Sequence, residues 1–499
     1  MARARCSGIL LHPTSLPGPH GIGDLGPEAY RWVDWLAGSG CAYWQTLPLG
    51  PTGYGDSPYF CFSAFAGNPY LVSPDLLTAD GFLAPADTTG APAFPGGRVD
   101  FGMVIPWKLG LLDQAFDRFR VNPPEGSVSG YHAFRRAESA WLDDYALFMA
   151  LKDTHGGGPW AKWPADLRHR RPGALAEARA ALTLEIERQA FRQFLFFDQW
   201  RRLRDHARGR GVRVMGDAPM YVAADSADVW AHPELFKLDD DLQPTVVAGV
   251  PPDFFTEEGQ LWGNPVYDWE HHATDGYSWW IARLRALLAL ADLVRIDHFR
   301  AFVDYWEVPA GSPTAASGHW VPGPGAAFFR RVEKALGGLP IVAEDLGVLH
   351  PEVPALLEEV GLPGMKVMQF AYDGDPSNPF RPEHHSENCI AYTGTHDNDT
   401  TVGWYRSLCA RQRRAVRAAL GSRGRGVAWD LIRAAWASPA FLAVAPVQDV
   451  LEVGPEGRMN TPGSSGANWS WRLGEAALTP ARQERLAEAN RAAGRYRAG

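Results

Sequence analysis

The sequence is poor in cysteine and in long apolar runs, and both shortages restrict the kind of protein it encodes. Its 499 residues include five cysteines, which form no C-x-x-C pair and no Cys/His cluster with zinc-ligand spacing. The amino-terminal apolar run covers only residues 8–11, whereas a signal peptide needs about 7–15 apolar residues. No stretch reaches the roughly 18 uncharged apolar residues of a membrane span. These features predict a cytoplasmic protein without a membrane partner.

Lysine is also scarce, since only six of the 48 basic residues are lysine and the net charge is −9. A net negative charge argues against a protein that binds the nucleic-acid backbone. The sequence has no glycine-rich phosphate loop that follows a strand and opens a helix, and no convincing cage of metal ligands. We therefore predict no cofactor, no bound metal and no nucleic-acid partner.

Tryptophan, in contrast, is abundant, with 20 residues in a chain that is 46% hydrophobic and 21% charged. So many bulky, amphipathic side chains indicate a large core, platforms for a flat-faced ligand, or both. We expect two populations. Trp44 and Trp200 fall on apolar strand and helix patterns, whereas Trp262, Trp469 and Trp471 lie where they would contact a ligand.

Short apolar runs that end in polar or charged residues recur along the chain and are typical of strands buried on both faces. Helical patterns separate them, at 278–290, 326–336, 352–360, 410–420 and 428–437. Eight strands that alternate with helices predict an α/β fold of the (β/α)8, or TIM, barrel type. The predicted strands are residues 42–49, 69–72, 212–219, 291–298, 340–345, 364–371, 389–397 and 441–449.

Two gaps between these strands are too long for simple crossovers. Residues 75–210 contain helix patterns at 131–154 and 172–208, which predicts an inserted helical subdomain between the second and third strands. A second insertion covers residues 239–275. After residue 449 the chain is too short for a C-terminal β-sandwich of about 100 residues. We therefore expect one catalytic domain over residues 1–499.

Four carboxylates follow predicted strands: Asp217, Asp297, Glu344 and Asp397. Each alone has a simple alternative role as a cap of the next helix. Because the carboxyl ends of barrel strands meet at the active-site face, four of them predict one shared pocket. Like charges in one pocket push carboxyl pKa values apart.

Enzymes that cleave glycosidic bonds with retention use two carboxylates with divergent pKa values, one as nucleophile and the other as acid/base. A divalent metal held by several carboxylates fits the spacing equally well. Arg295 favours the first reading, because it lies two residues before Asp297 and so on the same strand face. A guanidinium there would keep Asp297 ionised and would oppose metal binding.

Long blocks of the sequence resemble glycoside hydrolase family 77, the amylomaltases or 4-α-glucanotransferases of the α-amylase clan. The resemblance covers nearly the whole chain and implies a (β/α)8 barrel with helical insertions. The blocks are LLHPTSLPGPHGIGDLG (10–26), YWQTLPLGPTGYGDSPY (43–59), SAFAGNPYLV (63–72), GDAPMYVAADSADVWAHPELF (216–236), VAGVPPDFFTEEGQLWGNPVYDW (247–269), LVRIDHFRAF (293–302), VAEDLGV (342–348), GLPGMKVMQFAY (361–372), YTGTHDNDTTVGWY (392–405) and PVQDVL (446–451).

The resemblance also implies residue roles: Asp297 as nucleophile, Glu344 as general acid/base and Asp397 as transition-state stabiliser. Further residues resemble donor-subsite contacts, although an interior histidine with satisfied hydrogen bonds is the alternative for both histidines. These residues are Arg295, His396, Asp217, Tyr59 and His298.

Residues 251–265 resemble the family's lid loop, with Gly259 and Gly263 as flexible points. A transferase must cover its intermediate so that a sugar hydroxyl outcompetes water. Phe254, Phe255 and Trp262 would supply apolar cover, and Glu257 or Gln260 would bind the acceptor. Further out, the implied contacts are Tyr54, Phe101, Asn460, Trp469 and Trp471, with core packing as the alternative for each aromatic ring.

The motif GDAPMYV (216–222) lacks the histidine that commonly closes the third-strand motif elsewhere in the clan, which argues against an ordinary α-amylase. The resemblance predicts a cytoplasmic, cofactor-independent 4-α-glucanotransferase that acts with retention. Its expected partners are α-1,4-glucans: maltooligosaccharides, amylose and starch chains as donors, with glucose as one acceptor. Cyclisation of long chains stays open. The rival readings are an amylase-type hydrolase and a non-catalytic glucan-binding module.

Overall fold

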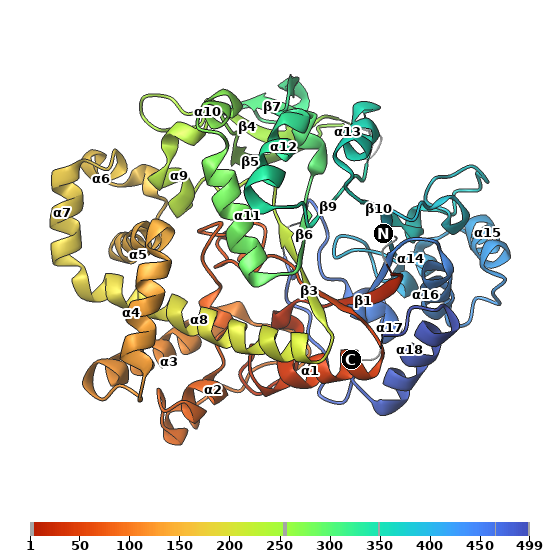
Figure 1. The fold of residues 1–499 in the computed structure, drawn as a ribbon, viewed down its shortest axis with the longest axis horizontal. Coiled ribbons are helices and arrows are strands. Elements are labelled where there is room, and N and C mark those ends of the chain that lie inside the picture. Colours follow the sequence, from red (N-terminus) through yellow and green to blue (C-terminus); the bar gives the residue numbers. More distant parts are fainter. Residues whose placement is uncertain (1–3, 253–256, 348–349, 465, 498–499) are drawn as a thin grey trace.

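The computed structural model describes residues 4–252, 257–347, 350–464 and 466–497. Its centre is an eight-stranded parallel sheet surrounded by helices (Figure 1), in the order β10-β11-β12-β1-β2-β3-β6-β9. The two edges meet where the Ala343 N–H donates to the carbonyl of Pro363 over 2.9 Å. The strands are β1 (Cys6–Leu10), β2 (Tyr43–Gln45), β3 (Arg213–Ala218), β6 (Leu293–Ile296), β9 (Ile341–Ala343), β10 (Gly364–Val367), β11 (Cys389–Tyr392) and β12 (Leu442–Pro446). The predicted (β/α)8 barrel is confirmed.

The barrel strands are apolar because helices cover one face and the barrel core covers the other. Every residue of β11 and β12 is buried. One predicted strand, at residues 69–72, is wrong, since Pro69–Leu71 forms a 3-10 helix. Pro69 lacks an N–H for a sheet ladder, and the Asn68 side chain accepts from the Tyr70 N–H instead. The strand that completes the barrel is β1, which pairs with both β2 and β12.

The predicted helices at 278–290, 352–360 and 410–420 coincide with α11 (Ser278–Leu290), α13 (Glu352–Val360) and α15 (Ala410–Leu420). The remaining helices that follow the barrel strands are α1 (Pro27–Gly38), α12 (Gly325–Leu336), α14 (Thr401–Ser407), α16 (Val427–Ala437) and α17 (Val447–Val450). The C-terminal helix α18 (Pro480–Ala492) packs beside the barrel, where the Ser7 hydroxyl of β1 donates to Asn490 Oδ1 over 2.6 Å.

Between β2 and β3 the chain forms a group of helices beside the barrel (Figure 1). The predicted helix at 131–154 is broken at Glu138 and that at 172–208 at Leu182, so each forms two helices. On the helix over residues 183–209, Phe191, Trp200 and Leu203 are buried, whereas Phe194 and Phe197 of the same predicted apolar face are half-buried. The group consists of α2 (Pro74–Ala79), α3 (Phe101–Val121), α4 (Ser127–Ala137), α5 (Ser139–Thr154), α6 (Ala165–Arg168), α7 (Pro172–Ala181) and α8 (Thr183–Gly209).

A second sheet, which the sequence reading missed, lies beside the barrel. It is antiparallel in the order β5-β4-β7-β8. Its strands are β4 (Val246–Val250), β5 (Gln260–Pro265), β7 (Asp304–Pro309) and β8 (His319–Pro322), and α9 (Ala227–Ala231) and α10 (Trp269–Thr274) flank β4 and β5 in the chain. The expected lid loop 251–265 is therefore wrong over its second half, because β5 pairs with β4. Phe254 and Phe255 lie outside the described residues.

No helix within the described ranges combines the length and the apolar character that a membrane crossing requires.

Candidate active site

Two strand ends place an arginine between two aspartates. Asp217 of β3 is the register partner of Arg295 of β6, and Asp297 follows β6 directly. Arg295 Nη1 donates to Asp217 Oδ1 and Oδ2 at 2.8 and 2.9 Å. Its Nη2 donates to Asp297 Oδ1 at 2.8 Å. The predicted contact between Arg295 and Asp297 is present, because residues two apart on a strand point the same way.

Burial alone would favour a neutral Arg295, but the carboxylates of Asp217 and Asp297 outweigh it and raise the pKa of the guanidinium well above its usual value. The charge of Arg295 is therefore permanent. The Asp217 side chain is fully buried, whereas that of Asp297 is 30% exposed. Of the two carboxylates on this arginine, only Asp297 is open to a ligand.

Glu344 follows β9 and is held by backbone donors. His298 N–H donates to Oε2 over 2.8 Å and Leu346 N–H to Oε1 over 2.7 Å. Loss of water contact and the neighbouring charge of Asp297 raise the pKa of Glu344 to about 7, although Arg295 and the two N–H donors oppose the shift. A carboxyl group with that pKa exists in both protonation states near neutrality, as an acid/base group requires.

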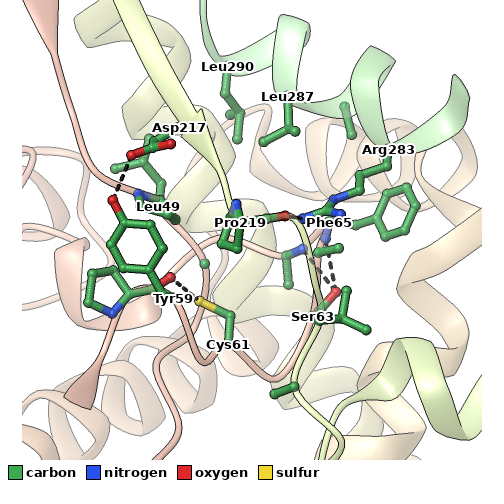
Figure 2. A pocket seen from close by; sticks show the side chains of 18 of the residues that line it. Leu49, Tyr59, Cys61, Ser63, Phe65, Asp217, Pro219, Arg283, Leu287 and Leu290 are labelled. Atoms are coloured by element: carbon green, nitrogen blue, oxygen red, sulfur yellow. Dashed lines mark hydrogen bonds between the residues drawn. The ribbon is translucent and has the colours of Figure 1, made fainter. Parts of the chain in front are cut away.

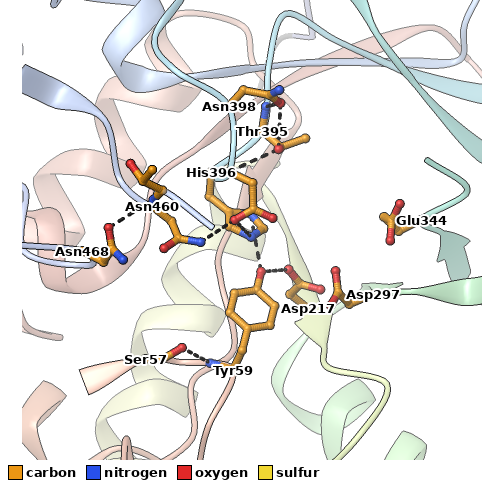
Figure 3. A network of polar contacts seen from close by, with 12 residues as sticks. Ser57, Tyr59, Asp217, Asp297, Glu344, Thr395, His396, Asn398, Asn460 and Asn468 are labelled. Carbon is orange, nitrogen blue, oxygen red and sulfur yellow. Dashed lines mark hydrogen bonds and ion pairs between the residues drawn. The ribbon is translucent and has the colours of Figure 1, made fainter. Parts of the chain in front are cut away.

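Asp397 lies on the loop after β11 and has partners of its own. Asn460 Nδ2 donates to Asp397 Oδ1 over 2.6 Å, and His396 Nε2 is 3.3 Å from the same oxygen. Tyr59 links this group to the arginine pair, because its hydroxyl donates to Asp217 Oδ2 over 2.6 Å and lies 3.4 Å from His396 Nδ1 (Figure 3). Of the four predicted carboxylates, Asp297 and Asp397 line the cleft at the barrel mouth, whereas Asp217 and Glu344 are connected to it through Arg295 and the His298 N–H. We call these residues the floor: Tyr59, Asp217, Arg295, Asp297, Glu344, His396 and Asp397.

The floor opens into a cleft of about 2860 Å³, a volume that includes solvent-open space, lined among others by Asp297, His298, His396, Asp397 and Asn460. We call the lining residues Tyr54, Phe101, Gln260 and Trp262 the rim. Tyr54 is 89% exposed, so its ring belongs to the protein surface and does not pack in the core. Glu257 is exposed and, within the described chain, neither Glu257 nor Trp471 lines this cleft.

Trp469 does line the cleft, but it is only 7% exposed. Its ring packs against Tyr59 and His396, with centroids 5.6 and 5.9 Å away. Trp469 therefore supports the floor, and its part in contacting a ligand is small.

A second, smaller cavity of about 570 Å³ shares Tyr59 with the cleft (Figure 2). Its other lining residues are largely apolar, such as Leu49, Leu287 and Leu290, and the Cys61 thiol there donates to the carbonyl of Pro58 over 3.0 Å. Its lining also includes Arg283 and the floor residue Asp217, so this cavity borders the floor.

Arg458 was missed at the sequence level. Its Nη2 donates to the backbone carbonyl of Asp397, and its Nε donates to that of Asn460, both over 2.8 Å. It therefore ties together the two loops that carry these residues. No periodic pattern marks a lone arginine in a loop, so only the fold reveals this function.

A parallel barrel with an arginine-bound aspartate and a glutamate of raised pKa at its strand ends, beside an open cleft, fits the class of enzymes that process glycosidic bonds. Comparison with known proteins narrows the class. The sequence model described as 4-alpha-glucanotransferase matches residues 11–478. The chain is 51% identical to a 4-alpha-glucanotransferase of Thermus thermophilus over 97% of this chain and 98% of that one. It is also 51% identical to one of Synechocystis over 95% and 94%.

Among solved structures, an amylomaltase from Streptococcus agalactiae in complex with acarbose superposes with a TM-score of 0.96 at 38% identity, over 99% of this chain and all of that one. The chain belongs to the 4-alpha-glucanotransferase family. It is an enzyme that transfers α-1,4-glucan segments.

Proposed function

We propose that Asp297 is the nucleophile, Glu344 the general acid/base and Asp397 the residue that holds the donor sugar. In the first half-reaction Asp297 attacks the anomeric carbon, and the bond from that carbon to the leaving O4 breaks while Glu344 gives O4 its proton. In the second, Glu344 takes the proton of an acceptor hydroxyl, whose oxygen displaces Asp297. Two inversions give net retention.

The observation that carries this assignment is the different environment of the carboxylates. Arg295 donates to Asp297 Oδ1 over 2.8 Å and orients its carboxylate at the cleft, which suits a nucleophile. Glu344 has a pKa raised to about 7, by desolvation first and by Asp297 second, which suits a group that must give and take a proton. Asp397 is 44% exposed and already accepts from Asn460, which suits a hydrogen-bonding clamp on sugar hydroxyls.

The remaining floor residues would support the donor sugar. Tyr59 and His396 stack on each other, with ring centroids 5.0 Å apart, and so present a preformed wall. Asp217 would hold Arg295 and Tyr59 in place without contacting the sugar, since its side chain is fully buried. At the rim, Trp262, Gln260 and Tyr54 line the cleft and would contact sugars on the acceptor side. Glu257 would have to move to reach an acceptor, because it lies away from the cleft lining.

We further propose that donors and acceptors are maltooligosaccharides and amylose chains, with glucose as an acceptor. The amylomaltase that superposes on this chain is complexed with acarbose, and the floor that would receive such an oligosaccharide is present here. We also propose that residues 1–499 form one catalytic domain with insertions at 75–210 and 239–275. The sparse, odd cysteine count supports a cytoplasmic enzyme.

Incubation with maltotriose alone tests the proposed substrates. Disproportionation should release glucose and build chains longer than maltotriose, because bound acceptor sugars outcompete water. Conversion to glucose and maltose without elongation would show hydrolysis and would overturn the proposed acceptor side. Glu344→Gln should lose about 10²–10⁴-fold in rate, the usual contribution of a general acid.

A further inference from the structure

His298 connects two parts of the site that the mechanism treats separately. Its N–H donates to Glu344 Oε2 over 2.8 Å, while its carboxyl-side neighbour Phe299 donates an N–H to the Glu344 carbonyl over 3.1 Å. Asp297 precedes it in the chain. The backbone of residues 297–299 therefore carries one carboxylate and holds the other.

The backbone of His298 is in the left-handed region, with φ 49° and ψ 49°. A residue other than glycine adopts this conformation only when its surroundings hold it there. On one side Phe299 is fully buried against Phe329, at a ring-centroid distance of 5.3 Å. On the other side the His298 ring packs against a second aromatic ring.

That neighbour is Trp262 of β5, outside the barrel. The two rings are perpendicular, at 84°, with centroids 4.8 Å apart, and both residues line the cleft. Trp262 is itself held, because its Nε1 donates to Gln260 Oε1 over 3.1 Å. The contact is therefore a direct link from the outer antiparallel sheet to the turn that donates to Glu344.

We propose that His298 is a positioning residue that ties the orientation of Glu344 to the place of Trp262 on β5. The contact with Trp262 holds the left-handed turn, and the turn holds the N–H on the carboxylate. A sugar that packs against Trp262 would therefore influence the orientation of Glu344 as well as contribute to its own binding. This inference rests on the role proposed for Glu344.

The groups around Glu344 and His298 determine whether the pKa of Glu344 should rise or fall in a variant. Arg295 and Asp297 face Glu344, and Asp297, Arg300 and Asp304 surround His298. Burial lowers the pKa of His298 to about 4, so its ring is neutral at neutral pH and adds no charge. The N–H of His298 favours ionised Glu344, so its withdrawal must raise the pKa of Glu344.

The test is the pH dependence of kcat/KM for maltotriose in Trp262→Leu, His298→Ala and the double variant. Alanine keeps the Cβ that makes a positive φ costly, so His298→Ala removes the ring contact while the turn still needs it. Each single change should move the basic limb of the profile upward by about one pH unit, the size expected for losing one hydrogen bond to a charged group. The double variant should show no further shift, because both changes break the same link.

Two controls separate this link from general loosening and from substrate contact. Trp306→Leu alters a tryptophan of β7 in the same outer sheet, whose Nε1 bonds the carbonyl of Ala315, and should leave the limb in place. Trp262→Phe keeps a ring against His298 and should shift the basic limb less than Trp262→Leu does. Melting temperatures measured on all variants identify any that are misfolded.

Changes in KM without a shift of the basic limb would overturn the inference, since they would show that His298 and Trp262 only contact substrate. An equal shift in Trp306→Leu would overturn it too. Full activity in Glu344→Gln would instead remove the role proposed for Glu344, and the inference would fall with it.

Discussion

At the bottom of the cleft Arg295 bonds two carboxylates at 2.8 Å, whereas at its mouth the Tyr54 side chain is 89% exposed. The floor residues are ordered by bonds to one another before any substrate arrives, so their geometry costs nothing during the reaction. Tyr54, an exposed rim residue, must be ordered by the ligand itself, which reduces what its contact contributes. Substitutions should therefore have large effects on the floor and a small effect at Tyr54.

The largest effect is expected for Asp297→Asn, which leaves the shape of the floor intact but removes the nucleophile. The rate of maltotriose disproportionation should fall by about 10⁴-fold or more, as when other covalent catalysts lose their nucleophile. Asp117→Asn, an exposed position on α3, is the matched control and should retain the wild-type rate. A variant of Asp297 with near-normal turnover would contradict the floor assignment.

Arg295→Gln should affect folding as well as activity. It leaves the buried carboxylate of Asp217 without its cation, and breaking such a pair costs about 3–5 kcal/mol of unfolding free energy. Protonation of Asp217 relieves this cost, so the difference from wild type should shrink as the pH falls. Urea unfolding at two pH values measures both effects, and equal stability of the two proteins at neutral pH would show that the pair contributes little.

The wild-type pH profile offers a sharper view of the floor. The pKa of Glu344 is raised to about 7, first by desolvation and then by Asp297. Because the first half-reaction needs the protonated acid, kcat/KM should be retained below pH 7 and lost above it. A profile that stays flat to pH 9 would mean that Glu344 is not the acid.

Tyr54→Ala should have the smallest effect. The side chain is exposed, so the unfolding free energy should change by less than about 0.5 kcal/mol. The maltotriose rate should change little, and the loss should grow with longer donors that extend to the rim. Equal losses for short and long donors would place Tyr54 nearer the floor than the structure does.

The difference between floor and rim also explains what could be predicted from the sequence. Asp217, Arg295 and Asp297 end adjacent strands, so strand periodicity and the barrel rule bring them together without knowledge of the coordinates. Rim positions depend on how inserted segments fold back. The pairing of β5 with β4 turned half of an expected loop into a strand, and the spacing of Glu257 gave no sign that it would lie off the cleft.

Long-range pairing limited the prediction inside the barrel as well. The short sequence of β1 becomes a strand only because β2 and β12 flank it, whereas Pro69–Leu71 has a similar apolar content and forms a helical turn. Arg458 and the left-handed His298 likewise gain their meaning from partners far along the chain. Local patterns do not contain this information.

The central claim is that Asp297 forms a covalent bond with the donor sugar, and mass spectrometry tests it most directly. Glu344→Gln should be incubated with an α-maltosyl fluoride, whose fluoride leaves without help from an acid, so that the intermediate accumulates for want of a base. After proteolysis, the peptide that contains Asp297 should carry one maltosyl unit. An unlabelled Asp297 peptide, or a label on another carboxylate, would contradict the account.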